Sequence, residues 1–183
     1  MSGELEKLMD GNKRFVSGKI SPKNLPARRA ELVSGQKPFA IILTCSDSRV
    51  SPEYIFDVSL GDIFVVRTAG NIADSIALGS MEYAAEHLGS TLLLVLGHEK
   101  CGAVNATCAG GRAPGNIAAI VSEIAPAAKA KGNNPEQTVP ENVKCVIEKI
   151  RKKSAILSHL ETEGKLKIAG AIYSLSSGEA KPL

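Results

Sequence analysis

The sequence predicts an α/β fold, with a mostly parallel sheet flanked by helices and an N-terminal helical arm. Four short apolar runs have the length of buried strands, and they alternate with longer segments of helical periodicity, which is typical of parallel sheets. Two of these runs end in cysteine or histidine, at the strand ends where open α/β sheets keep their chemistry. With 183 residues and 44% hydrophobic content, the chain has the size of one domain, residues 1–183.

The first 35 residues are expected to form the helical arm. Apolar residues recur on one face of its first helix: Leu5, Leu8, Met9 and Val16. Gly18 ends this helix, and Pro26 suits the first turn of a short helix at 27–33. The arm could pack on its own core or reach across to a partner, and the sequence does not choose between them.

The elements that follow are taken from apolar periodicity and from turn and cap residues. Strands are expected at 38–44, 63–67, 91–97 and 166–173. Helices are expected at 52–58, from Ser75 to Gly89, from Cys101 toward Cys108, from Asn116 to an interruption at Pro126, and from Val139 through Leu157 to a stop before Gly164. The chain then ends in a turn and a short tail.

Metal ligands are expected at two strand ends. Cys45 follows the first strand, and His98 and Cys101 follow the third. Two thiolates and one imidazole match the Cys₂His set of catalytic zinc sites, which keep a fourth position open. We therefore expect one zinc ion per chain. If these residues share it, strands one and three are neighbours, and the sheet order is 2-1-3-4 with its switch point between them.

The other two cysteines are expected to be small buried hydrophobes. Cys108 lies seven residues beyond Cys101, about 10 Å along a helix at ~1.5 Å per residue, which is too far for a shared ion. Cys145 has no other cysteine or histidine nearby in the sequence.

The two motifs together carry a family resemblance. CSDSRV at 45–50 with GHEKCG at 97–102 resembles the β-class carbonic anhydrases, over a stretch from about Gln36 to Gly102. The resemblance implies reversible, zinc-dependent hydration of carbon dioxide to bicarbonate and a proton. It also implies that Asp47 and Arg49 form a catalytic dyad that orders the water or hydroxide on zinc. The substrate pocket that it implies consists of Gln36, Phe64, Ala69, Tyr83 and Gly102.

The sequence differs from the family at two positions, Ala69 and Ile42. Ala69 stands where the family commonly has valine, which would widen the pocket. Ile42 stands where some bacterial members have the tryptophan of an inhibitory bicarbonate site. Arg67 and Tyr173 would fit the other positions of that site, but without the tryptophan we do not expect regulation of that type.

The dyad has a physical role that can be argued beside the resemblance. A bidentate fork between Arg49 and Asp47 would hold the carboxylate off the metal and keep it a hydrogen-bond acceptor. Two thiolates cancel the formal charge of the metal, so the hypothesis is that alkaline pH favours hydration and that in acid Asp47 replaces the water. The alternative for this pair is a structural ion pair in a loop.

The amino-acid composition limits which binding partners and which cellular location are expected. The net charge of +3 is scattered, so no nucleic-acid partner is expected, and no apolar run suggests a signal peptide or a membrane span. We expect a cytoplasmic protein whose four cysteines are thiols or metal ligands. The family resemblance implies a homodimer or larger homo-oligomer, with the N-terminal helix embracing the neighbour.

Three other functions remain open at this level. The same site could hydrolyse carbonyl sulfide or carbon disulfide, which are linear relatives of carbon dioxide. It could instead be a structural zinc site with Asp47 as a permanent fourth ligand. It could also be a redox or metal sensor that uses Cys45 and Cys101. Hydration is preferred because Asp47, Arg49 and Gln36 have no role together in a structural zinc site or in a sensor.

Overall fold

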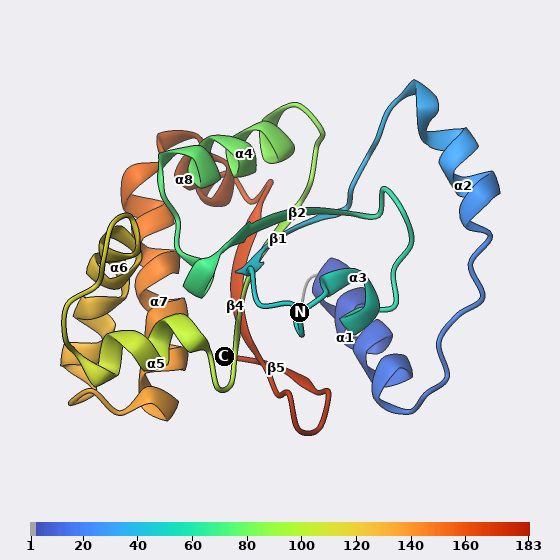
Figure 1. Ribbon diagram of the computed structural model, residues 1–183. Helices are drawn as coiled ribbons and strands as arrows, with labels where there is room; N and C mark the ends of the chain where they lie inside the picture. Colours follow the sequence, from blue (N-terminus) through green and yellow to red (C-terminus); the bar gives the residue numbers. More distant parts are fainter. Residues whose placement is uncertain (1–2) are drawn as a thin grey trace.

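The centre of the molecule is a five-stranded sheet in the order β2-β1-β3-β4-β5 (Figure 1). The structure is a computed structural model that describes residues 3–183. The strands are β1 (Ala40–Cys45), β2 (Ile63–Thr68), β3 (Leu92–His98), β4 (Lys167–Tyr173) and β5 (Ala180–Pro182). The first four run parallel, and β5 runs antiparallel to β4. The predicted fold class and the order 2-1-3-4 are confirmed, and β5 is an addition.

The helices cover both faces of this sheet. They are α1 (Gly3–Val16), α2 (Leu25–Glu31), α3 (Pro52–Ile55), α4 (Ser75–Glu86), α5 (Gly102–Ala109), α6 (Ile117–Ala130), α7 (Pro135–Lys153) and α8 (Ala155–Thr162), with short 3₁₀ turns η1 (Leu32–Ser34) and η2 (Ala69–Asn71). Among residues 3–183, none of the helices combines the length and the apolar character needed to cross a membrane.

All six side chains of β1 are buried, and successive ones enter two different cores. Ile41 and Leu43 pack with apolar residues of α4, α7 and α8 on one face. Ile42 packs on the other face with residues of α1 and α3. The strand alternation of side chains therefore gives the sheet two apolar faces, each covered by helices. Figure 1 shows α4, α7 and α8 on one side of the strands and α1 and α3 on the other.

Helix α1 packs on the chain's own core. Leu8 is fully buried, and Leu5 retains 4% of its exposure. The buried Asn12 amide donates to the carbonyl of Ile55 at 3.1 Å, and its oxygen accepts from the N–H of Ala180 at 2.8 Å. The expectation that the apolar face of α1 serves a neighbour is therefore wrong, because the chain itself covers that face. Helix α2 buries none of its residues and stands at the end of two extended connections (Figure 1).

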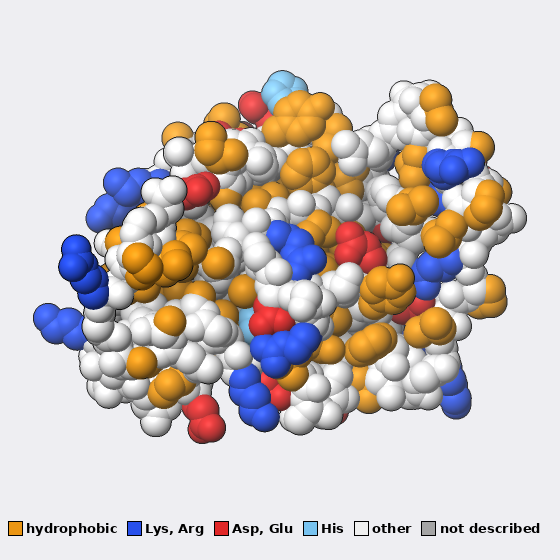
Figure 2. Space-filling view, viewed as in Figure 1, with side chains coloured by type: hydrophobic (Ala, Val, Ile, Leu, Met, Phe, Trp, Pro, Cys, Tyr) orange, Lys and Arg blue, Asp and Glu red, His pale blue; other side chains and the backbone are white. Residues whose placement is uncertain are grey.

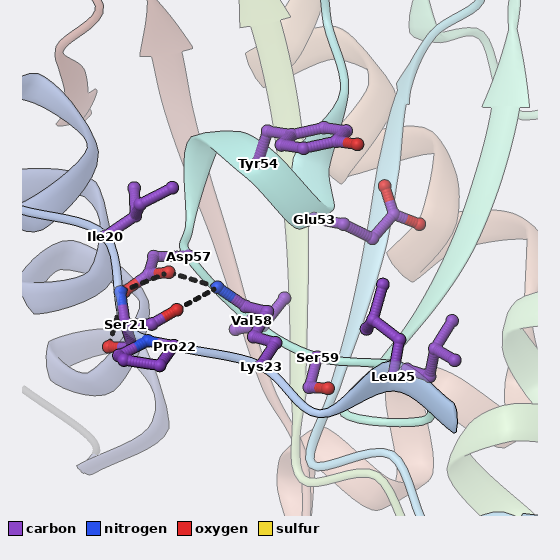
Figure 3. A pocket seen from close by; sticks show the side chains of 11 residues that line it. Ile20, Ser21, Pro22, Lys23, Leu25, Glu53, Tyr54, Asp57, Val58 and Ser59 are labelled. Carbon is purple, nitrogen blue, oxygen red and sulfur yellow. Dashed lines mark hydrogen bonds and ion pairs between the residues drawn. The ribbon is translucent and has the colours of Figure 1, made fainter. Parts of the chain in front are cut away.

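A buried carboxylate fixes the connection between α1 and α2. The Asp57 side chain is fully buried and accepts from Arg14 Nε at 2.6 Å, from the Ser21 N–H and hydroxyl, and from Lys23 Nζ. Figure 3 shows Asp57, Ser21 and Lys23 beside a hollow between this connection and α3. The hollow has a volume of about 550 Å³. Burial opposes ionisation, but the hydrogen bonds from Lys23, Arg14 and Ser21 outweigh it, so the pKa of Asp57 lies below its usual range.

Two helical expectations in the C-terminal half were wrong. The long helix expected from Val139 to Leu157 is divided at Ser154, whose hydroxyl oxygen accepts from the Leu157 N–H at 3.1 Å and caps α8. The same hydroxyl donates to Glu82 on α4 at 2.5 Å. Helix α6 continues through Pro126, because its apolar side is buried against α5 and α7.

Candidate metal centre

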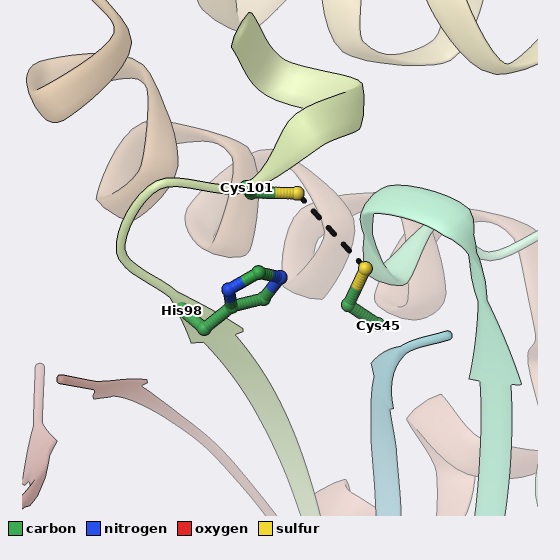
Figure 4. Close-up of side chains that lie close together, drawn as sticks. All are labelled: Cys45, His98 and Cys101. Atoms are coloured by element: carbon green, nitrogen blue, oxygen red, sulfur yellow. Dashed lines mark hydrogen bonds between the residues drawn. The ribbon is translucent and has the colours of Figure 1, made fainter. Parts of the chain in front are cut away.

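Three side chains that can bind a metal converge at the carboxyl edge of the sheet (Figure 4). Cys45 is the last residue of β1, His98 is the last residue of β3, and Cys101 immediately precedes α5. Their ligand atoms all lie within 4.8 Å of one another, and the two sulfurs are 4.0 Å apart. Because β1 and β3 are parallel neighbours, their ends deliver these residues to one point.

The histidine is held in the form that binds metals. Its Nδ1 lies 2.9 Å from the carbonyl oxygen of Glu99, so Nδ1 carries the proton and donates it. Its Nε2 is buried and has no hydrogen-bond partner within residues 3–183. An unpaired buried nitrogen is costly, and a backbone carbonyl on the opposite nitrogen is the usual support of a metal-binding imidazole. His98 therefore fits a metal ligand.

The two thiols also fit a bound cation. A hydrogen bond from the Cys101 thiol lowers the pKa of Cys45 to about 4 against the opposing effect of burial, and the Gly70 N–H helps at 3.3 Å from the sulfur. The same pairing, with burial, raises the pKa of Cys101. Without a cation the pair therefore holds one negative charge easily and a second only with difficulty. Two thiolates 4.0 Å apart repel each other, so a metal cation between them would stabilise both.

Apolar side chains surround the two cysteines. Ile72, Val104, Ile124 and Val139 form one buried cluster with the two cysteines. In such surroundings charges interact more strongly than at the surface. The Cys45, His98 and Cys101 group can hold a metal ion, and its soft donor set suits zinc.

Asp47 and Arg49 form a two-pronged ion pair beside the ligands. Arg49 Nε and Nη2 donate to the two carboxylate oxygens of Asp47 at 2.9 and 2.7 Å, and the Arg49 N–H adds a third bond at 3.0 Å. These hydrogen bonds from Arg49 hold the pKa of Asp47 below its usual range. The nearer carboxylate oxygen lies 4.0 Å from Nε2 of His98, so the carboxylate borders the ligand cluster.

Arg67 supports the segment that carries both Cys45 and Asp47. From the end of β2, its Nε donates to the Cys45 carbonyl at 3.1 Å and its Nη2 donates to the Asp47 carbonyl at 2.7 Å. Sequence reasoning missed this role and considered Arg67 only for an inhibitory site. The signal for it was a long basic side chain at the end of the strand adjacent to β1.

The structure brings only some of the expected pocket residues to this site. Ala69 precedes Gly70, which contacts Cys45, and Gly102 follows Cys101. Phe64 pairs with Ile41 in the sheet, four rows from the Cys45 row, which is about 13 Å at ~3.3 Å per residue.

The other two pocket residues also lie elsewhere on this chain. Gln36 is exposed and precedes β1, whereas Cys45 ends that strand. Five strand steps, about 16 Å, therefore separate the two ends. Tyr83 is half exposed on α4, where its ring lies 5.3 Å from that of His87. A single chain thus carries the metal ligands and the dyad together, but not the complete pocket.

Comparison with known proteins decides the family. Residues 40–180 match the family model described as carbonic anhydrase. Carbonic anhydrase 2 of Mycobacterium tuberculosis is 42% identical over 182 residues, which cover 94% of this chain and 88% of the relative. The chain belongs to the β-carbonic anhydrase family. The resemblance seen in the sequence and the prediction of a carbonic anhydrase are confirmed.

Further β-carbonic anhydrase relatives agree in sequence and in fold. A carbonic anhydrase of Mycolicibacterium smegmatis is 38% identical over 183 residues, covering 95% of this chain and 89% of the relative. A tetrameric β-carbonic anhydrase of Sordaria macrospora superposes with a TM-score of 0.79 at 22% identity, covering 100% of this chain and 98% of that one. The Coccomyxa enzyme in complex with acetazolamide gives a TM-score of 0.77 at 24% identity, covering 100% and 87%.

Proposed function

We propose that the chain catalyses the reversible hydration of carbon dioxide to bicarbonate and a proton, with one zinc ion held by Cys45, His98 and Cys101. The family and the fold support carbon dioxide hydration as the reaction. The observation that carries the zinc assignment is the buried Nε2 of His98, which has no partner within residues 3–183 and faces two sulfurs. A bound metal would complete a nitrogen left bare in this way.

The residues around the ligands supply orientation and a proton acceptor. If zinc is bound, Cys45, His98 and Cys101 would hold it, and it would supply an acidified water as the nucleophile. Asp47 stays ionised because Arg49 donates to both of its oxygens, and the fork fixes the carboxylate as an acceptor at the border of the site. Arg67 holds the backbone of the same segment, so the acceptor keeps its place. This arrangement favours a catalytic Asp47 over a permanent metal ligand.

We also propose that the working unit is a homodimer with two-fold symmetry, or a larger assembly built from it. Within the described chain, β2 pairs on one side only, so its other edge is open. Beside that edge, α4 exposes Ile76 to 77% and Tyr83 to 50%. Figure 2 shows hydrophobic side chains exposed at the α4 end of the molecule and over α2. An open strand edge beside exposed apolar residues suits a second copy.

Two-fold symmetry would also complete the pocket. Equivalent β2 edges that meet across a two-fold axis perpendicular to the strands run antiparallel, so the beginning of one strand lies near the end of the other. Phe64 at the beginning of β2 and Gln36 before β1 would then approach the partner's Ala69 and Gly102. In such a dimer, Gln36, Phe64 and Tyr83 would line the substrate pocket that a single chain does not complete.

A cytoplasmic location remains part of the proposal. All four cysteines are free thiols, which suits a reducing compartment.

The test is metal analysis and stopped-flow hydration on the purified chain, with serine replacing Cys101 in one variant and Cys145 in a matched control. Cys145 is a free cysteine on α7 outside the ligand group. We expect one zinc per chain and hydration in the unaltered protein and in Cys145→Ser. Cys101→Ser is expected to lose both. Unaltered protein that holds no stoichiometric metal, or equal activity in the two variants, would refute the proposal. Light scattering tests the dimer.

A further inference from the structure

Asn142 is a buried amide in a mostly apolar stripe of α7. It is 1% exposed, and its neighbours in the stripe include the valines Val139, Val143 and Val146. Its Nδ2 donates to the carbonyl oxygen of Gly70 at 3.0 Å, across a sequence separation of 72 residues. Burying an amide among hydrophobic groups costs free energy unless it makes hydrogen bonds, and here the oxygen has no partner within residues 3–183. The hydrogen bond to the Gly70 carbonyl is therefore the interaction by which Asn142 fixes another part of the chain.

That bond ends on the turn that touches Cys45. Gly70 accepts from Asn142 through its carbonyl and donates through its N–H to the Cys45 sulfur at 3.3 Å. The two groups belong to the same residue, so a rotation of the turn that released one would redirect the other. No other residue stands between α7 and the metal ligand along this route.

The turn consists of residue types that accept an unusual backbone. Gly70 has a φ of +72° and Asn71 a φ of +48°, so two consecutive residues lie in the left-handed region. Glycine adopts that region freely, and asparagine adopts it more readily than most residues with a side chain. A Cβ on residue 70 would lie 2.6 Å from Cδ1 of Ile124, so the close packing here requires glycine. The local sequence therefore allows this turn, and the contact with Ile124 and the hydrogen bond from Asn142 fix its position against α6 and α7.

We infer that Asn142 is a positioning residue of the metal centre, which fixes Gly70 so that its N–H points at the sulfur of Cys45. The inference rests on the proposed function, in that Cys45 must be a metal ligand. An N–H donor on a ligand sulfur orients it and draws electron density from it. Loss of such supporting partners typically weakens metal binding by 10–100-fold.

The test compares Asn142→Leu with Thr138→Val in full-length protein titrated with Co²⁺. Thr138 lies one turn earlier on α7, is fully buried, and donates to the helix's own Asn134 carbonyl at 2.7 Å. We expect Asn142→Leu to bind Co²⁺ roughly 10–100-fold more weakly and to shift the sulfur-to-cobalt charge-transfer band. Thr138→Val is expected to keep the affinity and the spectrum of the unaltered protein. A merely structural role for Asn142 would leave that band in place.

Unchanged affinity and band position in Asn142→Leu would overturn the inference, as would an equal shift in Thr138→Val. If Asn142→Leu fails to fold, the unaltered protein loaded with ¹¹³Cd provides the test. The Gly70 amide proton should then show scalar coupling to cadmium through the Cys45 sulfur, and its absence would overturn the inference. If the unaltered protein binds neither metal, the proposed function itself fails. If only the Asn142 results are negative, the metal centre stands and the positioning role falls.

Discussion

Replacing Asp47 with asparagine separates a catalytic dyad from a structural ion pair. The substitution keeps the shape of the side chain but removes its charge. The new amide could no longer accept from Arg49 on both terminal atoms, since one of them would become an N–H donor. The three hydrogen bonds that now fix the carboxylate, at 2.7 to 3.0 Å, would therefore be reduced.

The expected loss is large in activity and small in stability. A positioned proton acceptor contributes typically 10²–10⁴-fold, which corresponds to about 3–5 kcal/mol in the barrier. The Arg49 side chain is 53% exposed, and an ion pair of this exposure is worth about 0–1 kcal/mol to folding. Asp47→Asn should therefore reduce hydration in stopped flow at least 100-fold. It should keep its zinc and change the free energy of unfolding by less than about 1 kcal/mol.

The chain offers a matched control in a second bidentate pair. Arg151 donates to both oxygens of Glu161 at 2.8 Å, and its side chain is also about half exposed. Glu161→Gln should change stability as little as Asp47→Asn does and leave hydration unchanged. The reasoning is refuted if Asp47→Asn keeps more than a tenth of the activity. Loss of zinc from Asp47→Asn would instead favour Asp47 as a permanent ligand.

Three further outcomes are expected. Asp57→Asn should lower the free energy of unfolding in urea by about 2–4 kcal/mol at pH 7, because Lys23 and Arg14 lose a buried partner. The pKa of Asp57 is depressed, so its stabilisation is fully present above about pH 4 and is lost as pH falls through the lowered pKa; a gap between variant and unaltered protein that is as wide at pH 2 as at pH 7 would contradict this. Zinc at 100 times its dissociation constant should stabilise the fold by about 2.7 kcal/mol in calorimetry, and an identical melting curve after chelation would count against a bound metal. Hydration should rise from about pH 6.5 to 9 although Asp47, with its lowered pKa, stays ionised throughout, and a flat profile would exclude a titrating group at the metal centre.

Some of the differences between the predicted and the observed elements could have been predicted from the sequence. The exposed basic run at 151–153 lies in the last turn of α7, where basic residues typically occur. Ser154 directly after it is a cap residue, so the break between α7 and α8 was open to prediction. The strand β5 was not, because three residues that include Pro182 are too short to show alternation.

By itself the sequence determined the four parallel strands, their order and the residues of the candidate metal site. Cys45 and His98 could be placed because a side chain at the end of a buried strand has its position fixed by the strand itself, and sharing one ion then makes β1 and β3 neighbours. Only the tertiary structure decided that α1 covers its own core, that Gln36 lies at the far end of β1 from Cys45, and that Asn142 reaches Gly70. These are contacts between segments far apart in the chain. They depend on how whole helices pack, and the position of a single amide in a helical pattern does not indicate which residue it will contact.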